Sequence, residues 1–404
     1  MHDVSGHLFQ VQLSRELARR GHEVMHLYFE SFQSPRGNVQ RIAGDPPGFS
    51  IEGLRFEHPF EKYNLVKRRL HETRYGRMAA RRIAEFRPDI LLASNTPIDA
   101  QKVIHARCRS LGIPIVFWLQ DIYSIAIRTI LRRKLIPFSG LIAGWYERSE
   151  RRLLRESEAV VSISSDFEPI LAAWGVDPLR TFTIENWAPR EEVPPGPQEN
   201  SWSRRLGLAG KFVFLYSGTI GMKHNPGMLV SVADAFSTRP DVAVVVISEG
   251  LGADWIRARI KETPRPNLHV LPLQPFSDLP RALSSASVLL ALLGEESGEF
   301  SVPSKVLTYH CAGRPLLLAV PARNLAARIV KQNATGLVVP PDSQGQFVAA
   351  AERLYGDAAL RAGCSANALR YADEKFDIAK ITGQFEEIFE GIRGRVPALA
   401  TLAS

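Results

Sequence analysis

The sequence predicts an α/β protein of two domains, each built on a parallel sheet covered by helices. Short runs of β-branched and apolar residues alternate with stretches of helical period along nearly the whole chain. The length of 404 residues is enough for two separate cores. A proline-rich, glycine-containing acidic segment at 191–199 interrupts the alternation midway and predicts a linker.

The strands predicted on each side of this linker divide the chain. Those of the first half are 22–30, 90–93, 113–119, 159–163 and 181–184. Those of the second half are 211–216, 242–247, 268–271, 288–293, 316–319 and 336–339. We therefore predict an N-terminal domain over 1–188, a linker over 189–200, a C-terminal domain over 201–375 and a terminal helix over 376–404, for which a return to the N-terminal domain is one course.

The start of the chain breaks this pattern. Residues 2–6 are typical of a turn, and they lead directly into an amphipathic helix that ends at Gly21. A helix this early, followed by a strand, indicates the second half of a strand–turn–helix–strand unit. We therefore expect the first, central strand of the N-terminal sheet to be missing and the natural start to lie upstream of Met1.

Composition excludes several classes of protein. Apolar residues make up 45% and charged residues 23%, which is typical of a globular protein, and no apolar run reaches the roughly 18 residues that span a bilayer. The first residues lack a secretory signal, so we expect a cytoplasmic protein. Cys108, Cys311 and Cys364 fit neither a disulfide framework nor a zinc site. Most of the net charge of +8 lies in the N-terminal half, which suits an anionic partner and equally an ordinary solvated surface.

A candidate anion site follows the predicted strand 288–293. A helix is predicted to begin near Val302 and to be closed by Gly313. Its free N–H groups favour a diphosphate, and Lys305, Ser301 and Ser304 would add to the site, although an ordinary capped helix has the same pattern.

A second loop of this kind, 217–226, follows strand 212–216. Gly218 and Gly221 permit close approach of the backbone, and Lys223 lies in the loop. A single glycine-rich loop is typical of a tight turn. Two such loops on one predicted sheet, both carrying a lysine, favour an anion site.

Several motifs along the chain point to one family by their order and spacing. They are LARRGHEV at 17–24, RPDILLASNTP at 87–97, VFWLQDIY at 116–123, VSISSDF at 161–167, IENW at 184–187, YSGTIGMKHN at 216–225 and VPSKVLTYHCAGRP at 302–315. In this combination the chain resembles the retaining GT-B glycosyltransferases of family 4, and within them the colanic-acid and O-antigen sugar transferases.

The resemblance implies two Rossmann-like domains facing across a cleft. It implies a UDP- or GDP-linked sugar held mainly by the C-terminal domain, an acceptor held by the N-terminal one, and hexosyl or N-acetylhexosaminyl transfer between them. Lys223 matches the family lysine that neutralises the donor diphosphate, with Gly218 and Thr219 beside it, and Gly6 matches the N-terminal loop glycine. No cofactor or metal is implied, in line with the absence of an Asp-x-Asp pair from the sequence.

One part of the family pattern is not kept. The two-glutamate motif has Thr308 at its second position and Phe300 at its first, with Glu299 one residue away. The ribose-binding role of the second glutamate therefore passes to Thr308 or is lost. Glu299 reaches the sugar if the loop shifts by one residue, and Glu295 and Glu296 are alternatives.

Asp121 is the third catalytic candidate, beside Lys223 and Glu299. It follows the predicted strand 113–119, where a carboxylate can orient a sugar hydroxyl or accept the acceptor's proton, although a turn or helix-cap aspartate fits the same position. Asn95 follows strand 90–93 in the same way. The expected acceptor is a polyprenyl-diphosphate-linked sugar or a glycan of cell-surface polysaccharide synthesis.

The segment 125–154 combines basic and bulky apolar residues. Arg128, Arg132, Arg133 and Lys134 lie among them, which predicts peripheral contact with an anionic membrane at its inner face; a structural helix with a solvated basic edge is the alternative. Few aromatic residues interleave with the basic ones, so we do not expect nucleic acid as a partner. Two other functions stay open: a nucleotide-sugar-binding protein without transferase activity, and a nucleotide-sugar epimerase of the same fold.

Overall fold

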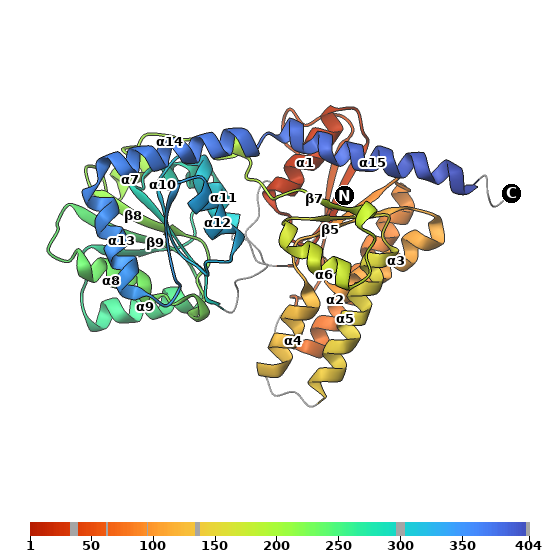
Figure 1. The fold of residues 1–404 in the computed structure, drawn as a ribbon, viewed down its shortest axis with the longest axis horizontal. Coiled ribbons are helices and arrows are strands. Elements are labelled where there is room, and N and C mark those ends of the chain that lie inside the picture. Colours follow the sequence, from red (N-terminus) through yellow and green to blue (C-terminus); the bar gives the residue numbers. More distant parts are fainter. Residues whose placement is uncertain (33–38, 62–63, 95, 134–137, 296–303, 401–404) are drawn as a thin grey trace. The chain divides into compact units, whose positions relative to one another are not determined.

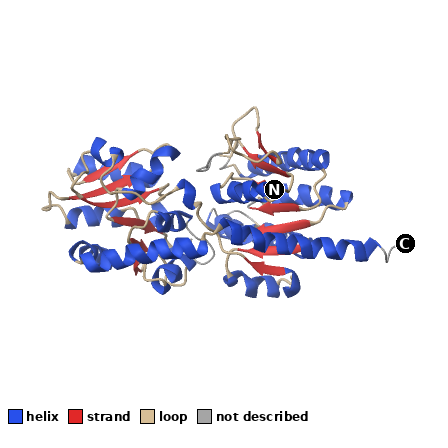
Figure 2. Cartoon of the chain, turned by 90° about the horizontal axis from the view of Figure 1, so that it is seen from above, coloured by secondary structure: helices blue, strands red, loops and turns tan. Residues whose placement is uncertain are grey.

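The computed structural model describes residues 1–32, 39–61, 64–94, 96–133, 138–295 and 304–400, and Figure 1 shows how they fold. The chain divides into two compact units. The first comprises Met1–Asn186 with Ile378–Ser404, and the second comprises Trp187–Asp377. Each is a parallel sheet between layers of helices, as Figure 2 also shows, so the predicted fold class is confirmed.

The first unit is built on a seven-stranded sheet in the order β3-β2-β1-β4-β5-β6-β7, in which the strand pairs are parallel. The strands are β1 (His2–Asp3), β2 (Val24–Phe29), β3 (Phe49–Leu54), β4 (Leu91–Ser94), β5 (Ile115–Leu119), β6 (Ala159–Ser162) and β7 (Thr181–Thr183). Central strands such as β5 are apolar along their whole length because helices cover both faces of the sheet.

The prediction that the first strand is missing was wrong. The central position is occupied by β1, in which His2 lies opposite Leu27 of β2 on one side and Ala93 of β4 on the other. The α-amino group of Met1 also donates to the carbonyl of Met25, at 2.9 Å. His2 and Asp3 have low strand propensity and form a strand because the backbones of β2 and β4 pair with them on either side. A local sequence pattern does not reveal such pairing.

The helices of the first unit cover its two faces according to the alternation of side chains. On β5, the Trp118 ring contacts Phe9 of α1 and Phe385 of α15, whereas Phe117 faces His105 of α3. The C-terminal helix α15 is therefore part of this unit. The helices are α1 (Leu8–Arg19), α2 (Leu65–Phe86), α3 (Ile98–Leu111), α4 (Tyr123–Arg133), α5 (Ser139–Glu156), α6 (Glu168–Ala173) and α15 (Ile378–Ala400).

The second unit has a six-stranded sheet in the order β10-β9-β8-β11-β12-β13. Its strands are β8 (Phe212–Ser217), β9 (Val242–Ile247), β10 (Leu268–Leu271), β11 (Val288–Leu292), β12 (Leu316–Ala319) and β13 (Gly336–Val339). Its helices are α7 (Ser201–Arg205), α8 (Gly227–Ala235), α9 (Leu251–Glu262), α10 (Leu279–Ser284), α11 (Ser304–Cys311), α12 (Leu325–Gln332), α13 (Gln344–Gly356) and α14 (Ala358–Lys375). Helices α8, α9 and α13 pack with the sheet in one apolar core.

The segment 189–200, predicted as a linker, belongs to the second unit. It contains a 3-10 turn at Arg190–Glu192, and the Arg314 guanidinium donates to the carbonyl of Gly196 at 2.8 Å. The unit boundary falls at Asn186, two residues before the predicted one. Within the described ranges, no helix combines the length and the apolar character that crossing a bilayer requires.

Candidate functional site

Two loops of the second unit meet at the carboxyl edge of its sheet. Strands β8 and β11 are parallel neighbours, with Leu215 opposite Leu289, so the loops that follow them leave the sheet side by side. Gly294, just past β11, donates its N–H to Nδ1 of His224 at 3.2 Å. A Cβ atom at Gly294 would overlap the carbonyl oxygen of Lys223. The structure therefore places the Lys223 loop directly against the end of β11.

Lys305, in the first turn of α11, is held over the same loop. Its Nζ donates to the hydroxyl of Tyr216 at 2.7 Å and lies 3.9 Å from the centre of that ring. The Tyr216 hydroxyl donates onward to the carbonyl of Thr219 at 3.0 Å. Burial lowers the pKa of Lys305 to about 7, because an ammonium group out of water loses solvation. The side chain is thus a positioned cation with a readily changed charge.

A second tyrosine fixes α11 to the end of β8. The Tyr309 hydroxyl accepts from the Ser217 N–H at 2.9 Å and donates to the Ser217 carbonyl at 3.1 Å. Burial raises the pKa of Tyr309 well above its usual value, so the hydroxyl keeps its proton. Neither Tyr216 nor Tyr309 was singled out from the sequence. The four-residue spacing of Lys305 and Tyr309, which puts them on one helix face, was the available signal.

The charges of both lysines affect the pKa of His224. Its pKa is lowered to about 4, first by burial and then by the charges of Lys223 and Lys305. The imidazole is therefore neutral near pH 7, with Nδ1 accepting from the backbone, while Lys223 itself is exposed. Two ammonium groups around one neutral ring favour an incoming dianion such as a diphosphate.

Gly218 gives Lys305 its room. Its φ is +123°, and a Cβ atom there would lie 2.9 Å from Nζ and 3.2 Å from Cε of Lys305. The sequence predicted that this glycine admits a ligand close to the backbone. In the structure it is the side chain of Lys305 that occupies the space beside it.

The remaining donor-site candidates lie around this cluster or outside the described residues. Thr219 and Ser304 are exposed, and the hydroxyl of Thr308 donates to the Ser304 carbonyl of its own helix at 3.3 Å. Glu299 and Ser301, like the alternative Glu296, lie outside the described residues. Glu295 lies 3.9 Å from Arg323. Among the residues that are described, no group of three His, Cys, Asp or Glu side chains is placed to hold a metal ion.

In the first unit, Asp121 is exposed just past the carboxyl end of β5. Beside it, Gln120 accepts from the Asn186 amide at 2.6 Å. The loop is fixed by a residue that sequence reasoning missed, the buried Glu150, which accepts from the N–H groups at the start of α4, Tyr123 at 2.9 Å and Ser124 at 3.0 Å. Burial raises the pKa of Glu150 to about 7. Asn95 lies outside the described residues.

The Gly6 loop is organised by a second buried carboxylate. Gly6 has a φ of +67°, and the N–H groups on either side of it, of Ser5 and His7, donate to Asp3 at 2.9 and 2.8 Å. Burial raises the pKa of Asp3, against the effect of these donors. The loop's flanking N–H groups are therefore engaged by the chain's own carboxylate. Asp3, the last residue of β1, fell within the turn predicted over residues 2–6 and was not singled out from the sequence.

Comparisons with known proteins agree with this architecture. Residues 9–192 match the model of Glycosyltransferase Family 4, and residues 211–357 match the model of Glycosyl transferases group 1. Both models describe glycosyltransferases, and the fold of two Rossmann-like domains is that of GT-B glycosyltransferase structures.

Among individual proteins, the probable glycosyltransferase WbjE of Pseudomonas aeruginosa is 22% identical over 259 residues, which are 63% of this chain and 63% of that protein. HepE of Anabaena, solved in complex with UDP and glucose, is 16% identical with a TM-score of 0.70 over 96% of this chain and 98% of that one. The sucrose-phosphate synthase of Thermosynechococcus elongatus is 15% identical with a TM-score of 0.73 over 98% of both chains. At these identities the structural likeness is one of fold.

The close packing of Lys305 against Gly218 can be tested directly. We expect Gly218→Ala to lower the free energy of unfolding of the second unit by about 2 to 3 kcal/mol, because it adds a contact with Lys305 to backbone strain. Gly250→Ala is the control: its φ is +96° and the nearest atom to an added Cβ is the Ile220 carbonyl oxygen at 3.8 Å, so about 1 to 2 kcal/mol of strain without crowding is expected. Equal losses in the two variants, measured by chemical denaturation, would contradict the proposed crowding.

Proposed function

We propose that the protein transfers a hexosyl or N-acetylhexosaminyl group, with retention, from a UDP- or GDP-linked sugar to a polyprenyl-diphosphate-linked or glycan acceptor in cell-surface polysaccharide synthesis. The observation that carries the proposal is the convergence of Lys223 and Lys305 at one edge of the second sheet. HepE, whose structure holds UDP and glucose, supports a nucleotide-sugar donor, and the name of WbjE supports transfer.

The chemistry of the reaction fits two lysines in this place. Breaking the bond between the sugar and the donor phosphate leaves additional negative charge on the departing diphosphate. Fixed cations that gain attraction as this charge develops stabilise the transition state more than the ground state. Lys305 is pre-positioned by Tyr216, so little reorganisation is needed at the moment of reaction. Lys223, exposed at the loop surface, supplies the second positive charge.

The other candidates take supporting roles in the proposal. We assign Gly218, Thr219, Ser301, Ser304 and Thr308 to the donor. Asp121, at the carboxyl edge of the first sheet, orients a sugar hydroxyl or accepts the acceptor's proton, and Glu299 contacts the sugar. Gly6 keeps its assignment near the diphosphate, by way of the backbone conformation that Asp3 maintains.

A nucleotide-sugar-binding protein without transferase activity is the second candidate. Thr308 stands where the family carries a ribose-binding glutamate, and its hydroxyl donates to its own helix. Donor hydrolysis and transfer assays separate the two, because a binding protein would retain UDP affinity and show no turnover.

The role of Lys223 is tested by Lys223→Ala. We expect turnover to fall by about a hundredfold, the scale for loss of one group that stabilises a developing anion. Lys261→Ala is the matched control, since Lys261 is an exposed lysine of the same unit on α9, and its turnover is expected to be unchanged. Full activity of Lys223→Ala would remove this lysine from the mechanism.

The same assay in EDTA is expected to give the wild-type rate, because the lysines supply the positive charge. A loss of activity in EDTA that magnesium restores would refute metal independence.

The pKa of Lys305 predicts a pH-dependent donor affinity. With the site empty this lysine is charged below pH about 7 and neutral above it, whereas a bound diphosphate favours the charged form. Binding above pH 7 must therefore take up a proton, and we expect UDP affinity to fall between pH about 7 and 9, by up to about tenfold per unit. Calorimetry in buffers of different ionisation enthalpy measures the uptake. Lys305→Met should abolish this slope and Lys223→Ala should keep it; a flat wild-type profile would count against the assignment.

A membrane-held acceptor requires a surface that reaches the bilayer, and we propose that α2, α4 and α5 form it at the inner face of the cell membrane. Helix α4 packs against α5, and Arg69 of α2 lies over the Trp145 ring of α5 at 4.8 Å (Figure 1). Exposed large apolar side chains gather on them. They are Leu65, Val66 and Leu70 on α2, Ile125 and Ile130 on α4, and Phe138, Leu141 and Ile142 around the start of α5.

In this proposal, insertion of apolar side chains contributes more to membrane binding than the basic residues do. Arg128 is paired with Glu147, and only Arg132 of the predicted quartet is described as an exposed cation, since the side chain of Arg133 and all of Lys134 lie outside the described residues. Trp145 is only partly exposed and has Arg69 and Lys102 against its ring, which makes it a weaker anchor. Phe138 and Leu141, at 77% and 70% exposure, are the better anchors.

Co-sedimentation with liposomes tests this surface. We expect a variant with Arg128, Arg132, Arg133 and Lys134 changed to Ser to lose binding to anionic vesicles at low salt, and Phe138→Ser with Leu141→Ser to lose it at any salt. Leu179→Ser is the control, because Leu179 is 79% exposed elsewhere in the same unit. Wild-type sedimentation of both variants would show that these helices are structural only.

A further inference from the structure

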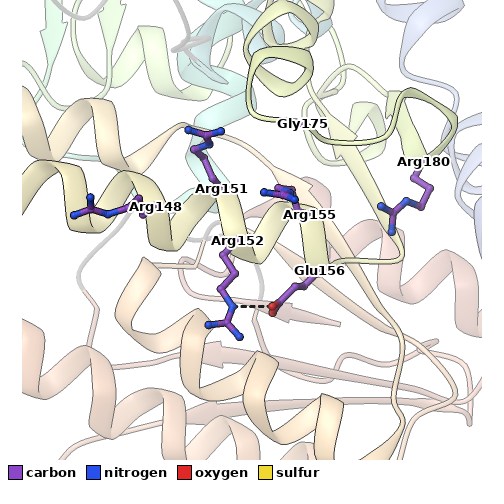
Figure 3. A pocket seen from close by; sticks show the side chains of 7 residues that line it. All are labelled: Arg148, Arg151, Arg152, Arg155, Glu156, Gly175 and Arg180. Carbon is purple, nitrogen blue, oxygen red and sulfur yellow. Dashed lines mark hydrogen bonds and ion pairs between the residues drawn. The ribbon is translucent and has the colours of Figure 1, made fainter.

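A cluster of arginines lies on α5, beyond the surface proposed to meet the membrane. Arg148, Arg151, Arg152 and Arg155 recur at spacings of three and four residues, so their side chains share one side of the helix. With Glu156, Gly175 and Arg180 they line a pocket of about 570 Å³. Figure 3 shows the four arginines following one another along α5, with Arg180 on a neighbouring segment.

The pocket is separate from the candidate acceptor site of the same unit. Helix α5 ends at Glu156, just before β6 begins at Ala159, and Arg180 directly precedes β7 at Thr181. The pocket therefore lies toward the amino ends of these parallel strands. Asp121 follows the carboxyl end of β5, at the opposite edge of the sheet.

The positive charge in this pocket is not balanced by the residues around it. Glu156 is shared between Arg152, at 2.7 Å, and Arg109. Arg180 lies 3.5 Å from Asp177 and donates to the Ser157 carbonyl at 3.1 Å. In the part of the chain that the structure describes, Arg148, Arg151 and Arg155 have no carboxylate within 4.0 Å, the ion-pair distance. The helix dipole favours a cation in the last turn, which accounts for Arg155 alone.

We propose that this pocket binds a ligand carrying two or more phosphate groups. Guanidinium groups bind phosphate through paired N–H donors, and several of them around one concavity match several phosphates better than a single one. The shared chemistry belongs both to soluble polyphosphates and to phospholipid headgroups. This site is independent of the proposed donor site, since it lies in the other unit and contains neither Lys223 nor Lys305.

Calorimetric titration with inorganic tripolyphosphate, at physiological ionic strength, tests the pocket. It is carried out on the full chain with Lys223→Ala and Lys305→Met, so that neither lysine of the proposed donor site remains. We expect Arg151→Ser with Arg155→Ser to weaken binding by at least about tenfold, as two charge-assisted contacts are lost. Arg19→Ser with Arg81→Ser removes the same charge from exposed positions on α1 and α2 and is expected to leave the affinity within about twofold. Thermal unfolding checks that all variants fold.

Equal affinity of the two double variants, or no binding by the parent, would overturn the proposal unless the lipid arm succeeds. That arm uses vesicles of phosphatidylcholine with and without phosphatidylinositol bisphosphate. Sedimentation that requires the bisphosphate, is lost in Arg151→Ser with Arg155→Ser and is kept in Arg19→Ser with Arg81→Ser assigns the pocket to a lipid headgroup. Failure of both arms refutes it, and neither result depends on whether the protein transfers sugar.

Discussion

Parallel strand pairing is the constraint on which the arrangement of this protein depends. In a parallel sheet the segments that follow the strands leave at one edge and those that precede them enter at the other. The pairing of β8 with β11 is what brings Lys223, from the loop after one strand, against Gly294, after the other. The same rule in the first unit puts Asp121 at one edge and the arginine pocket at the opposite one.

The cluster in the second unit concentrates positive charge in a partly buried place, and it does so through neutral partners. Lys305 is held by a phenol and His224 by a backbone N–H, so neither meets a carboxylate in the contacts described. A lysine paired with an acid would be more stable in the empty protein and less attractive to an anion. The lowered pKa of Lys305 is the consequence, since the charge is fully stabilised only when an anion arrives.

Buried carboxylates in the first unit act on backbone rather than on cations. Asp3 collects the N–H groups around Gly6, and Glu150 collects those that open α4. Each fixes a loop at the carboxyl edge of the sheet without occupying its surface. Arg128, by contrast, is paired with Glu147, which weakens the electrostatic part of membrane contact and leaves Phe138 and Leu141 as the stronger contribution.

The sequence by itself determined the fold class and eleven of the described strands, because buried parallel strands are continuous apolar runs. It did not reveal β1, whose two residues are a strand only through hydrogen bonds to β2 and β4. Nor did it show that Gly218 makes room for Lys305, that Glu150 caps α4, or that Arg69 and Lys102 lie against the Trp145 ring. Tertiary structure decided these contacts, because each one joins residues that are far apart in the chain. A local sequence pattern does not indicate which distant residues will meet.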